Sequence, residues 1–208
     1  AVFFNKAKNF ITTRPYLDGR RFENTDKAET KGLELTVSYD IDSLGLTPYA
    51  SAAYIRRKTT DIIDVVQLFP SRTDRREVFT TSDTGTPPFG GRVGVRWNKD
   101  LTEAMTFRSD FFMEWAVKAK QTYFDSDYVY DVHGTGTPAT YDHAFVTDVH
   151  EAWQTFNVAL GMDWGQEKNW HASFAVRNIF DQAYSRAHNS PTNLDPGFNV
   201  TASIGYEF

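Results

Sequence analysis

The chain of 208 residues contains no cysteine, which excludes disulfides, thiolate metal sites and cysteine nucleophiles. It also lacks any apolar run that approaches the roughly 18–20 residues of a transmembrane helix, so membrane-spanning helices are excluded. An excess of basic residues is missing too. The 22 Lys and Arg against 27 Asp and Glu give a net charge of −5, which argues against a nucleic-acid partner. Aromatic residues are plentiful, at 15%, and this argues against disorder.

The first residues also lack the features of a signal peptide. No basic region, apolar core or small-residue cleavage site follows Ala1. Residues 2–13 instead resemble part of a structured element. We therefore expect either a mature protein with a short lead-in or a piece of a larger protein.

The most informative pattern is an alternation of apolar and polar residues. In residues 32–41, Leu33 and Leu35 share one face, and Glu34 and Thr36 share the other. Successive side chains of a strand point to opposite sides, so this segment is predicted to be a strand with one apolar face. The alternation recurs in residues 92–98, 105–117, 155–164, 171–177 and 198–208. With the weaker segments 2–13 and 46–56, the sequence predicts about eight antiparallel strands.

The predicted connections alternate between short and long. Residues 42–45, 99–102 and 165–169 are short and polar, as tight hairpins require. The polar segments 14–27, 59–89, 122–151 and 181–197 are much longer. Soluble β-sandwiches do not normally show this asymmetry, whereas outer-membrane barrels have short periplasmic turns and long extracellular loops. The predicted fold class is therefore all-β, an antiparallel transmembrane β-barrel.

Aromatic residues gather at two levels of these strands. Five lie beside short turns or at the chain end: Trp97, Trp164, Trp170, Tyr206 and Phe208. Trp115 and Trp153 lie toward the opposite strand ends, although Trp153 breaks the phase of its strand. Aromatic belts at both lipid interfaces are typical of membrane barrels. The alternative is a soluble all-β binding domain, in which the apolar faces would form a buried sandwich core.

Three segments carry a resemblance to a known family. Residues 176–184, Val-Arg-Asn-Ile-Phe-Asp-Gln-Ala-Tyr, resemble the Asn-Leu-Phe-Asp-x-x-Tyr segment that ends the penultimate strand of TonB-dependent outer-membrane receptors. Residues 31–35, Lys-Gly-Leu-Glu-Leu, are similar to the Lys-Gly-x-Glu segment of an earlier strand, and residues 3–11 to the strand before it. A polar loop with Pro196-Gly197 and a last strand ending in Phe208 complete the order.

The resemblance implies that residues 1–208 are the C-terminal part of such a receptor, about eight strands of a barrel of about 22. Members carry a plug inside the barrel, and nothing in this chain resembles the plug or the TonB-contacting box. The family takes up ferric siderophores, haem, cobalamin or similar scarce ligands across the Gram-negative outer membrane. The implied partners are outer-membrane lipid and lipopolysaccharide, the rest of the receptor with its plug, the TonB complex through the plug, and a small iron ligand.

Two alternatives to this interpretation stay open. The first is a complete small barrel of about eight strands with a structural or adhesive role, in which residues 2–13 would pair with residues 198–208. The second concerns the ligand, because a haem receptor would share the fold. Arg and Tyr in the loops suit an anionic aromatic ligand, so we favour a ferric siderophore, of the catecholate type in particular.

Candidate ligand-binding residues lie in the predicted extracellular loops. Arg72, Arg75 and Arg76 could bind an anionic siderophore or lipid phosphates through charge-assisted contacts, or could be solvated beside neighbouring carboxylates. A second loop combines tyrosines and histidines, the residue types that bind haem: Tyr128, Tyr130, Tyr141, His133, His143 and His150. Their spacing matches no compact metal motif, so neither a metal site nor a cofactor is predicted.

Charged residues on the predicted polar faces form a second candidate set: Arg92, Arg96, Arg108, Asp110, Glu114, Asp163 and Arg177. In a large barrel they would line the wall that meets the plug, and in a small closed barrel they would neutralise one another. At the chain end, Ile204, Tyr206 and Phe208 resemble the C-terminal signal read by the barrel-assembly machinery. An ordinary closing strand would contain the same residues.

The sequence offers little for an enzyme. Ser190 and His188 share a loop, but no nucleophile elbow surrounds them. Gly90 and Gly91 begin a strand rather than a phosphate-binding loop, and no pair of carboxylates stands out for acid–base chemistry. No catalytic residue is predicted.

Overall fold

The computed structural model describes residues 1–16, 19–67, 73–124, 145–186 and 192–208, with side chains for 1–8, 27–60, 78–123, 145–186 and 192–208. All elements within them are β-strands: β1 (Val2–Tyr16), β2 (Gly19–Ser38), β3 (Leu46–Gln67), β4 (Thr73–Thr81), β5 (Phe89–Thr102), β6 (Met105–Ala116), β7 (Ala119–Phe124), β8 (Phe145–His150), β9 (Trp153–Trp164), β10 (Trp170–Arg177) and β11 (Asn199–Tyr206). In this part of the chain no helix has the length and apolar character needed to cross a membrane. The predicted all-β class is confirmed.

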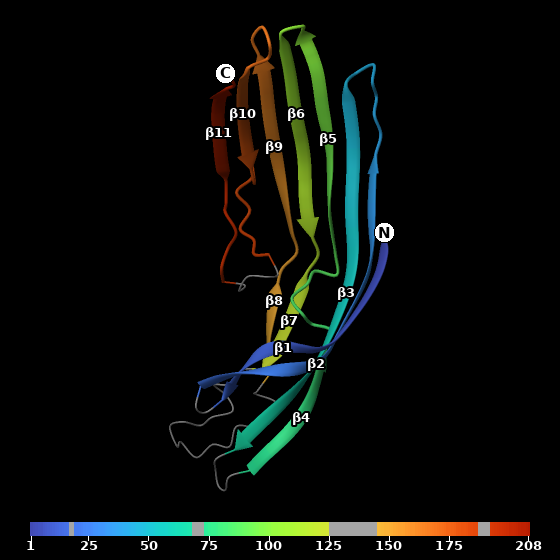
Figure 1. Ribbon diagram of the computed structural model, residues 1–208, viewed down its shortest axis with the longest axis vertical. Helices are drawn as coiled ribbons and strands as arrows, with labels where there is room; N and C mark the ends of the chain where they lie inside the picture. Colours follow the sequence, from blue (N-terminus) through green and yellow to red (C-terminus); the bar gives the residue numbers. More distant parts are fainter. Residues whose placement is uncertain (17–18, 68–72, 125–144, 187–191) are drawn as a thin grey trace.

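Eight strands form one antiparallel path in the order β1-β2-β3-β5-β6-β9-β10-β11 (Figure 1). The number agrees with the predicted eight. Strand β4 pairs with β3 off this path, and β7 and β8 form a separate two-stranded sheet. Among the described strands β1 pairs only with β2 and β11 only with β10, so residues 2–13 do not pair with the last strand. The described sheet is open, unlike the small closed barrel.

Short turns lie at one end of the sheet and long hairpins at the other (Figure 1). The turn between β2 and β3 contains Gly45 at φ 65°, in the left-handed region that glycine adopts without a steric penalty. The predicted hairpin between residues 92–98 and 105–117 is present, but its turn is shorter than the predicted 99–102 and lies later: β5 continues to Thr102, past a register shift, and β6 begins at Met105. The polar residues at the end of this strand have the composition of a turn, and only the strand pairing distinguishes a strand end from a turn.

The prediction that residues 14–27, 59–89 and 122–151 are loops is also wrong in part. Strands β1 and β2 stay paired until Tyr16 meets Gly19, and β3 pairs with β4 through Gln67 and Thr73. The two-stranded β7–β8 sheet lies in the third segment. Apolar residues in the β3 extension stand in adjacent pairs, Ile62-Ile63 and Val65-Val66, and not in alternation with polar ones, so no hydrophobic alternation marks these extensions. Residues 181–197 contain no strand where they are described.

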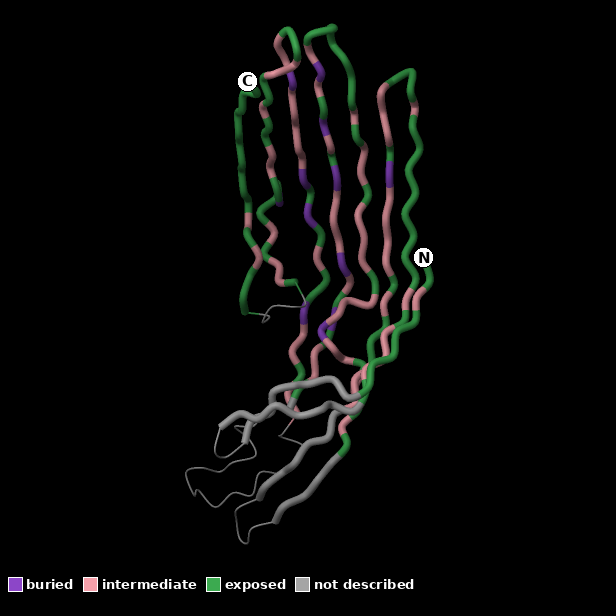
Figure 2. Tube along the Cα trace, in the orientation of Figure 1, coloured by how far each residue is buried: buried purple, intermediate pink, exposed green. Residues whose placement is uncertain are grey.

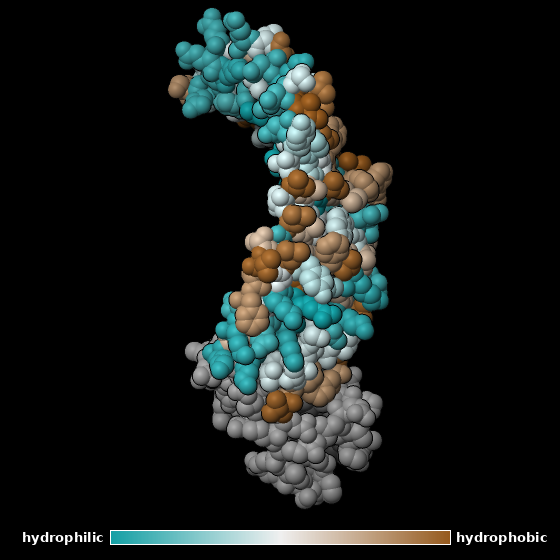
Figure 3. Space-filling model, turned by 90° about the vertical axis from the view of Figure 1, so that its right-hand side faces the viewer, coloured by the Kyte–Doolittle hydropathy of each residue, from teal (hydrophilic) through white to brown (hydrophobic). Residues whose placement is uncertain are grey.

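The sheet has one polar and one apolar face, as predicted. The apolar face is exposed, with Leu35 62% and Ile204 69% accessible, and no second layer of described strands covers it. A sandwich core is therefore excluded. Buried residues lie along β3, β6 and β9 (Figure 2), and many, such as Tyr49 and Asn157, are on the polar face. Seen from the side, hydrophobic residues occupy the middle of the described part of the molecule, between two hydrophilic zones (Figure 3).

An aromatic row crosses the apolar face beside the short turns. The rings of Trp164 and Trp170 stack at 5.9 Å, and Tyr206 lies 4.8 Å from Trp170 and 4.9 Å from Phe208. Trp97 lies beside the turn between β2 and β3, where its indole nitrogen donates to the Leu44 carbonyl at 3.0 Å. Indole and phenol groups with one apolar and one hydrogen-bonding side are suited to a lipid–water boundary. The predicted position of these aromatic residues beside short turns or at the chain end is confirmed.

Candidate functional site

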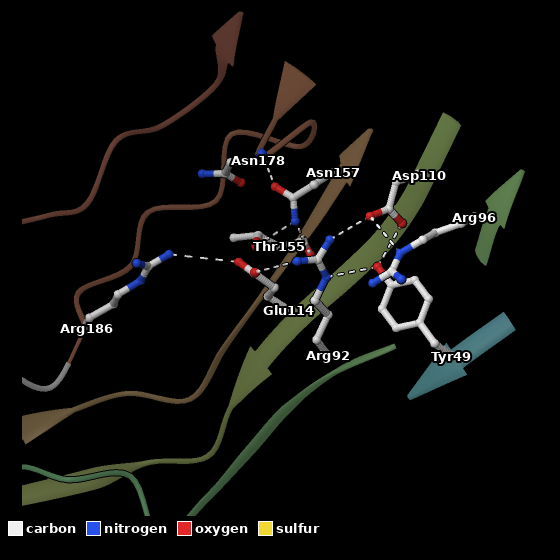
Figure 4. A network of polar contacts seen from close by, with 9 residues as sticks. All are labelled: Tyr49, Arg92, Arg96, Asp110, Glu114, Thr155, Asn157, Asn178 and Arg186. Carbon is white, nitrogen blue, oxygen red and sulfur yellow. Dashed lines mark hydrogen bonds and ion pairs between the residues drawn. The ribbon is translucent and has the colours of Figure 1, made fainter. Parts of the chain in front are cut away.

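The polar face contains a hydrogen-bonded network centred on Arg92 (Figure 4). Its Nε donates to the Tyr49 hydroxyl at 3.0 Å and a terminal nitrogen donates to Asp110 at 2.8 Å. The Tyr49 hydroxyl in turn donates to Asp110 at 2.7 Å. The guanidinium lies 3.5 Å from the centre of the Phe112 ring, which places a cation against an aromatic face. Arg92 is therefore fixed by three strands, β3, β5 and β6.

Arg96 lies at the edge of the same network. Its guanidinium is 4.3 Å from the centre of the Tyr49 ring and 3.9 Å from Asp110, without a hydrogen bond, and its side chain is 58% exposed. Gly94 lies between the two arginines on β5. A Cβ at this position would come within 2.7 Å of the Tyr49 hydroxyl, so glycine leaves the space that the Tyr49 side chain occupies on the sheet.

The family-like segment at the end of β10 forms a corner held by Asn178. Asn178 is buried, has φ 51°, and its amide oxygen accepts from the Gln182 backbone at 2.9 Å while its amide nitrogen donates to the Gln182 carbonyl at 2.9 Å. Its own backbone N–H donates to the Asn157 side chain at 3.0 Å. Asp181 accepts from the Phe198 backbone N–H at 2.7 Å. This corner fixes the connection toward β11.

Arg186 connects this corner to the wall. Its guanidinium lies 3.9 Å from Glu114 and 3.7 Å from Asp195, and 5.8 Å from the centre of the Trp153 ring. Glu114 also lies 3.9 Å from Arg92. Trp153 packs against Tyr184 at 4.6 Å. Trp153 pairs with Ala116 on the polar face, which explains its broken phase: it belongs to this cluster and not to an aromatic belt.

Two hollows adjoin Arg186 near the long-hairpin end. One of about 300 Å³ lies between the wall and the corner; its lining includes Glu114, Asn157, Arg177, Asn178, Tyr184 and Arg186. The other, of about 410 Å³, is lined by Arg57, Thr84, Gly85, Thr86, Pro87, Trp153 and Arg186. Both combine guanidinium groups with an aromatic ring, a combination suited to an anionic ligand with aromatic groups.

The opposite end of the sheet holds two ion-paired clamps. Asp163 of β9 pairs with Arg108 of β6 and hydrogen-bonds His171 of β10 at 2.8 Å. Beyond the aromatic row, Lys168 donates to Asp100 at 2.9 Å and to the Thr106 hydroxyl at 2.7 Å. The Thr106 hydroxyl and then Lys168 lower the pKa of the Asp100 carboxyl, because both hydrogen-bond its charged form. This clamp joins the ends of β5 and β6 to the turn between β9 and β10.

The seven charged residues predicted for the wall fall into three groups. Arg92, Arg96, Asp110 and Glu114 lie in one network, Arg108 with Asp163 forms a separate clamp, and Arg177 lines the smaller hollow. Arg75 and Arg76 lie in strand β4 rather than in a loop, and their side chains lie outside the described residues. Arg72, Tyr128, Tyr130, Tyr141, His133 and His143 lie outside the described residues altogether. Ile204, Tyr206 and Phe208 lie exposed on the apolar face.

The sequence analysis missed Tyr49, Phe112, Asn157, Arg57 and Arg186. One signal was available: Phe112 is an aromatic residue in a polar position of an otherwise regular alternation. His150 is buried, and neither of its ring nitrogens has a hydrogen-bond partner within the described structure. No group of three or more His, Asp or Glu residues in the described part of the chain could hold a metal ion.

An open antiparallel meander with an exposed apolar face, an aromatic row and a polar wall defines this chain as part of an outer-membrane-type barrel. The family model for the TonB dependent receptor-like beta-barrel matches residues 1–179. The chain therefore belongs to the TonB-dependent receptor barrel family, as the sequence motifs predicted.

One solved structure agrees with this chain at the level of fold. The structure of the FpvAI receptor in complex with pyocin S2 has a TM-score of 0.55 and 15% identity to this chain. The match covers all of this chain and 24% of that one. The Pseudomonas aeruginosa ferripyoverdine receptor bound to ferripyoverdine has a TM-score of 0.40 and 13% identity, and the match covers 89% of this chain and 28% of that one. The siderophore receptor PirA from Acinetobacter baumannii has a TM-score of 0.44 and 13% identity, and the match covers 99% of this chain and 36% of that one. The chain spans about a quarter to a third of these receptors. No curated protein matches it.

Proposed function

We propose that this chain is the C-terminal barrel part of an outer-membrane receptor that takes up a ferric siderophore in a TonB-dependent manner. The plug and the contact with the TonB complex would come from the rest of the receptor, and the polar wall around Arg92 would face the plug. Membership of the receptor barrel family supports the transport role, and the exposed apolar face supports a place in the outer membrane.

The observation that carries the ligand class is the pair of hollows around Arg186. Two guanidinium groups, from Arg57 and Arg186, and the Trp153 ring line the larger one. A ferric tris-catecholate carries negative charge and presents aromatic rings at its surface, so it matches both features. Haem is the alternative ligand. The burial of His150 argues against that residue as an accessible haem ligand.

The test is uptake of radioactive iron by cells that produce the whole receptor, with and without TonB. We expect TonB-dependent uptake of a ferric tris-catecholate, and a loss of binding of about tenfold for each of Arg57→Gln and Arg186→Gln, the usual magnitude for a charge-assisted hydrogen bond. Lys118→Gln is the matched control, because Lys118 pairs with Glu151 and lines neither hollow. Uptake without TonB, uptake of haem alone, or equal losses in the control would contradict the proposal.

A further inference from the structure

The apolar face of β1, β2 and β3 changes character abruptly toward the long-hairpin end. Cross-strand pairing places Val2, Leu33 and Tyr54 in one row on this face, and all three are strongly exposed. Phe89 of β5 extends the row, because it pairs with Tyr54. This last apolar row, at the end opposite the Trp164–Trp170 row, is the last on these strands in which every described side chain is apolar.

Cations occupy the next three rows on the same face. The register aligns Phe4, Lys31 and Arg56 in the first row. Lys6, Glu29 and Lys58 follow in the second, and Lys8, Lys27 and Thr60 in the third. We call the cations of these rows the basic patch: Lys6, Lys8, Lys27, Lys31, Arg56 and Lys58. They are exposed, and Glu29 is the one carboxylate among them, so six cations minus one anion give a local charge of +5.

The geometry of the sheet makes the basic patch compact. Alternate residues of a strand are about 7 Å apart and neighbouring strands about 4.8 Å apart, so the cations occupy an area of roughly 10 by 14 Å before their side chains extend. Lys6 binds Glu29 at 2.9 Å. Glu29, beyond the apolar band, has a lowered pKa, first through the hydrogen bond from Lys6 and also through the charges of Lys58 and Lys31. Three of these cations therefore interact electrostatically with the Glu29 carboxylate.

The basic patch is separate from the ligand site. Arg57 lies between Arg56 and Lys58 in the sequence but faces the opposite side, where it lines the larger hollow. The basic patch instead continues the lipid-facing surface, just beyond the last apolar row. Figure 3 shows this arrangement from the side of β1 to β3, with a hydrophilic cluster directly below the hydrophobic middle of the molecule.

We propose that the basic patch binds the phosphate groups of lipopolysaccharide in the outer leaflet. The long hairpins mark the extracellular end of the barrel, so the last apolar row lies at the outer-leaflet interface. A phosphorylated lipid whose acyl chains lie against Val2, Leu33 and Tyr54 places its phosphates at the height of Lys31, Arg56 and Lys58. Lys and Arg bind phosphate through charge-assisted hydrogen bonds. This inference depends on the outer-membrane placement in the proposed function, but not on the siderophore.

The experiment titrates the whole purified receptor, freed of lipid in detergent, with bisphosphorylated lipid A and counts bound lipid by native mass spectrometry. Parallel titrations use dephosphorylated lipid A and inorganic phosphate. The test variants are Arg56→Gln and the triple Lys31→Gln/Arg56→Gln/Lys58→Gln. Arg57→Gln is the matched control, one residue away on the opposite face. The double variant Lys31→Arg/Lys58→Arg keeps the charges, and heat-modifiable migration on gels establishes that each barrel is folded.

We expect bisphosphorylated lipid A to bind the wild type, with affinity falling about fivefold for each cation removed and by about two orders of magnitude in the triple variant. The Arg57→Gln and Lys-to-Arg variants should bind bisphosphorylated lipid A like the wild type, although Arg57→Gln weakens siderophore binding. Equal binding of dephosphorylated lipid A, wild-type binding by the triple variant, or patch-dependent binding of inorganic phosphate alone would overturn the proposal. Siderophore binding by the same preparations tests the proposed function separately.

Discussion

The Arg92 network makes a quantitative prediction about two arginines that approach the same carboxylate. Arg92→Met and Arg96→Met each remove one positive charge and keep a long apolar stem. Arg92 donates to Asp110 at 2.8 Å, whereas Arg96 reaches only 3.9 Å. The sequence alone gives no reason to distinguish them, because both occupy polar positions of β5. The structure predicts very different couplings to Asp110.

The magnitudes follow from geometry and exposure. The Arg92 and Asp110 side chains are 34% and 22% exposed, so their charge-assisted hydrogen bond keeps much of its strength and should couple them by about 1–2 kcal/mol. Arg96 is 58% exposed and makes no hydrogen bond to Asp110, so its coupling should stay below about 0.5 kcal/mol, as for solvent-exposed ion pairs. The stacking of Arg92 on Phe112 adds about 0.5–1 kcal/mol to the single substitution, but cancels in a coupling energy.

Two double-mutant cycles check this difference. Each combines Asp110→Asn with one arginine substitution, and urea unfolding of the folded receptor in detergent, followed by tryptophan fluorescence, gives the free energies. We expect the Arg92 cycle to show at least twice the coupling of the Arg96 cycle. Equal couplings, or a larger one for Arg96, would refute the assignment of Arg92 as the centre of the network.

Two further predictions concern the ends of the sheet. Asn178→Ala should lower the free energy of unfolding by about 2–3 kcal/mol, since it removes hydrogen bonds from a buried residue at positive φ. Asn178→Gly, which keeps the φ angle, should lose less. Hydrogen exchange at Asp181, whose backbone N–H donates to the Asn178 carbonyl at 2.9 Å, measures both variants; equal exchange in the two would contradict a role for the backbone angle. Because the pKa of Asp100 is lowered in the folded state, the clamp stabilises the fold at pH values above about 4, where a free Asp is ionised. This stabilisation is lost as the pH falls and Asp100 becomes protonated. The thermal midpoint of Lys168→Met should therefore lie below that of the wild type at pH 7 and approach it at pH 3; a gap unchanged by pH would exclude the ion pair as its cause.

The sequence predicted the parts of this fold that depend on local alternation. Leu33, Leu35 and Val37 indicated a strand with an apolar face, and the structure exposes all three on one side of a single sheet. The order of short turns and the family-like segment around Asn178 were also visible in the sequence. These features are local because a side chain's face follows from its position in the strand.

The tertiary structure decided which residues of neighbouring strands lie side by side on the sheet. Strand register brings Tyr49 next to Arg92, and it places Lys6, Glu29 and Lys58 in one row. Alternation does not encode register, because shifting two strands by two residues leaves the faces unchanged. The extensions of β1 to β4 were missed for a related reason, since strand pairing is not visible in a sequence that lacks alternation. The sequence therefore determined the two faces and the family, whereas register assembled the Arg92 network, the hollows around Arg186 and the basic patch.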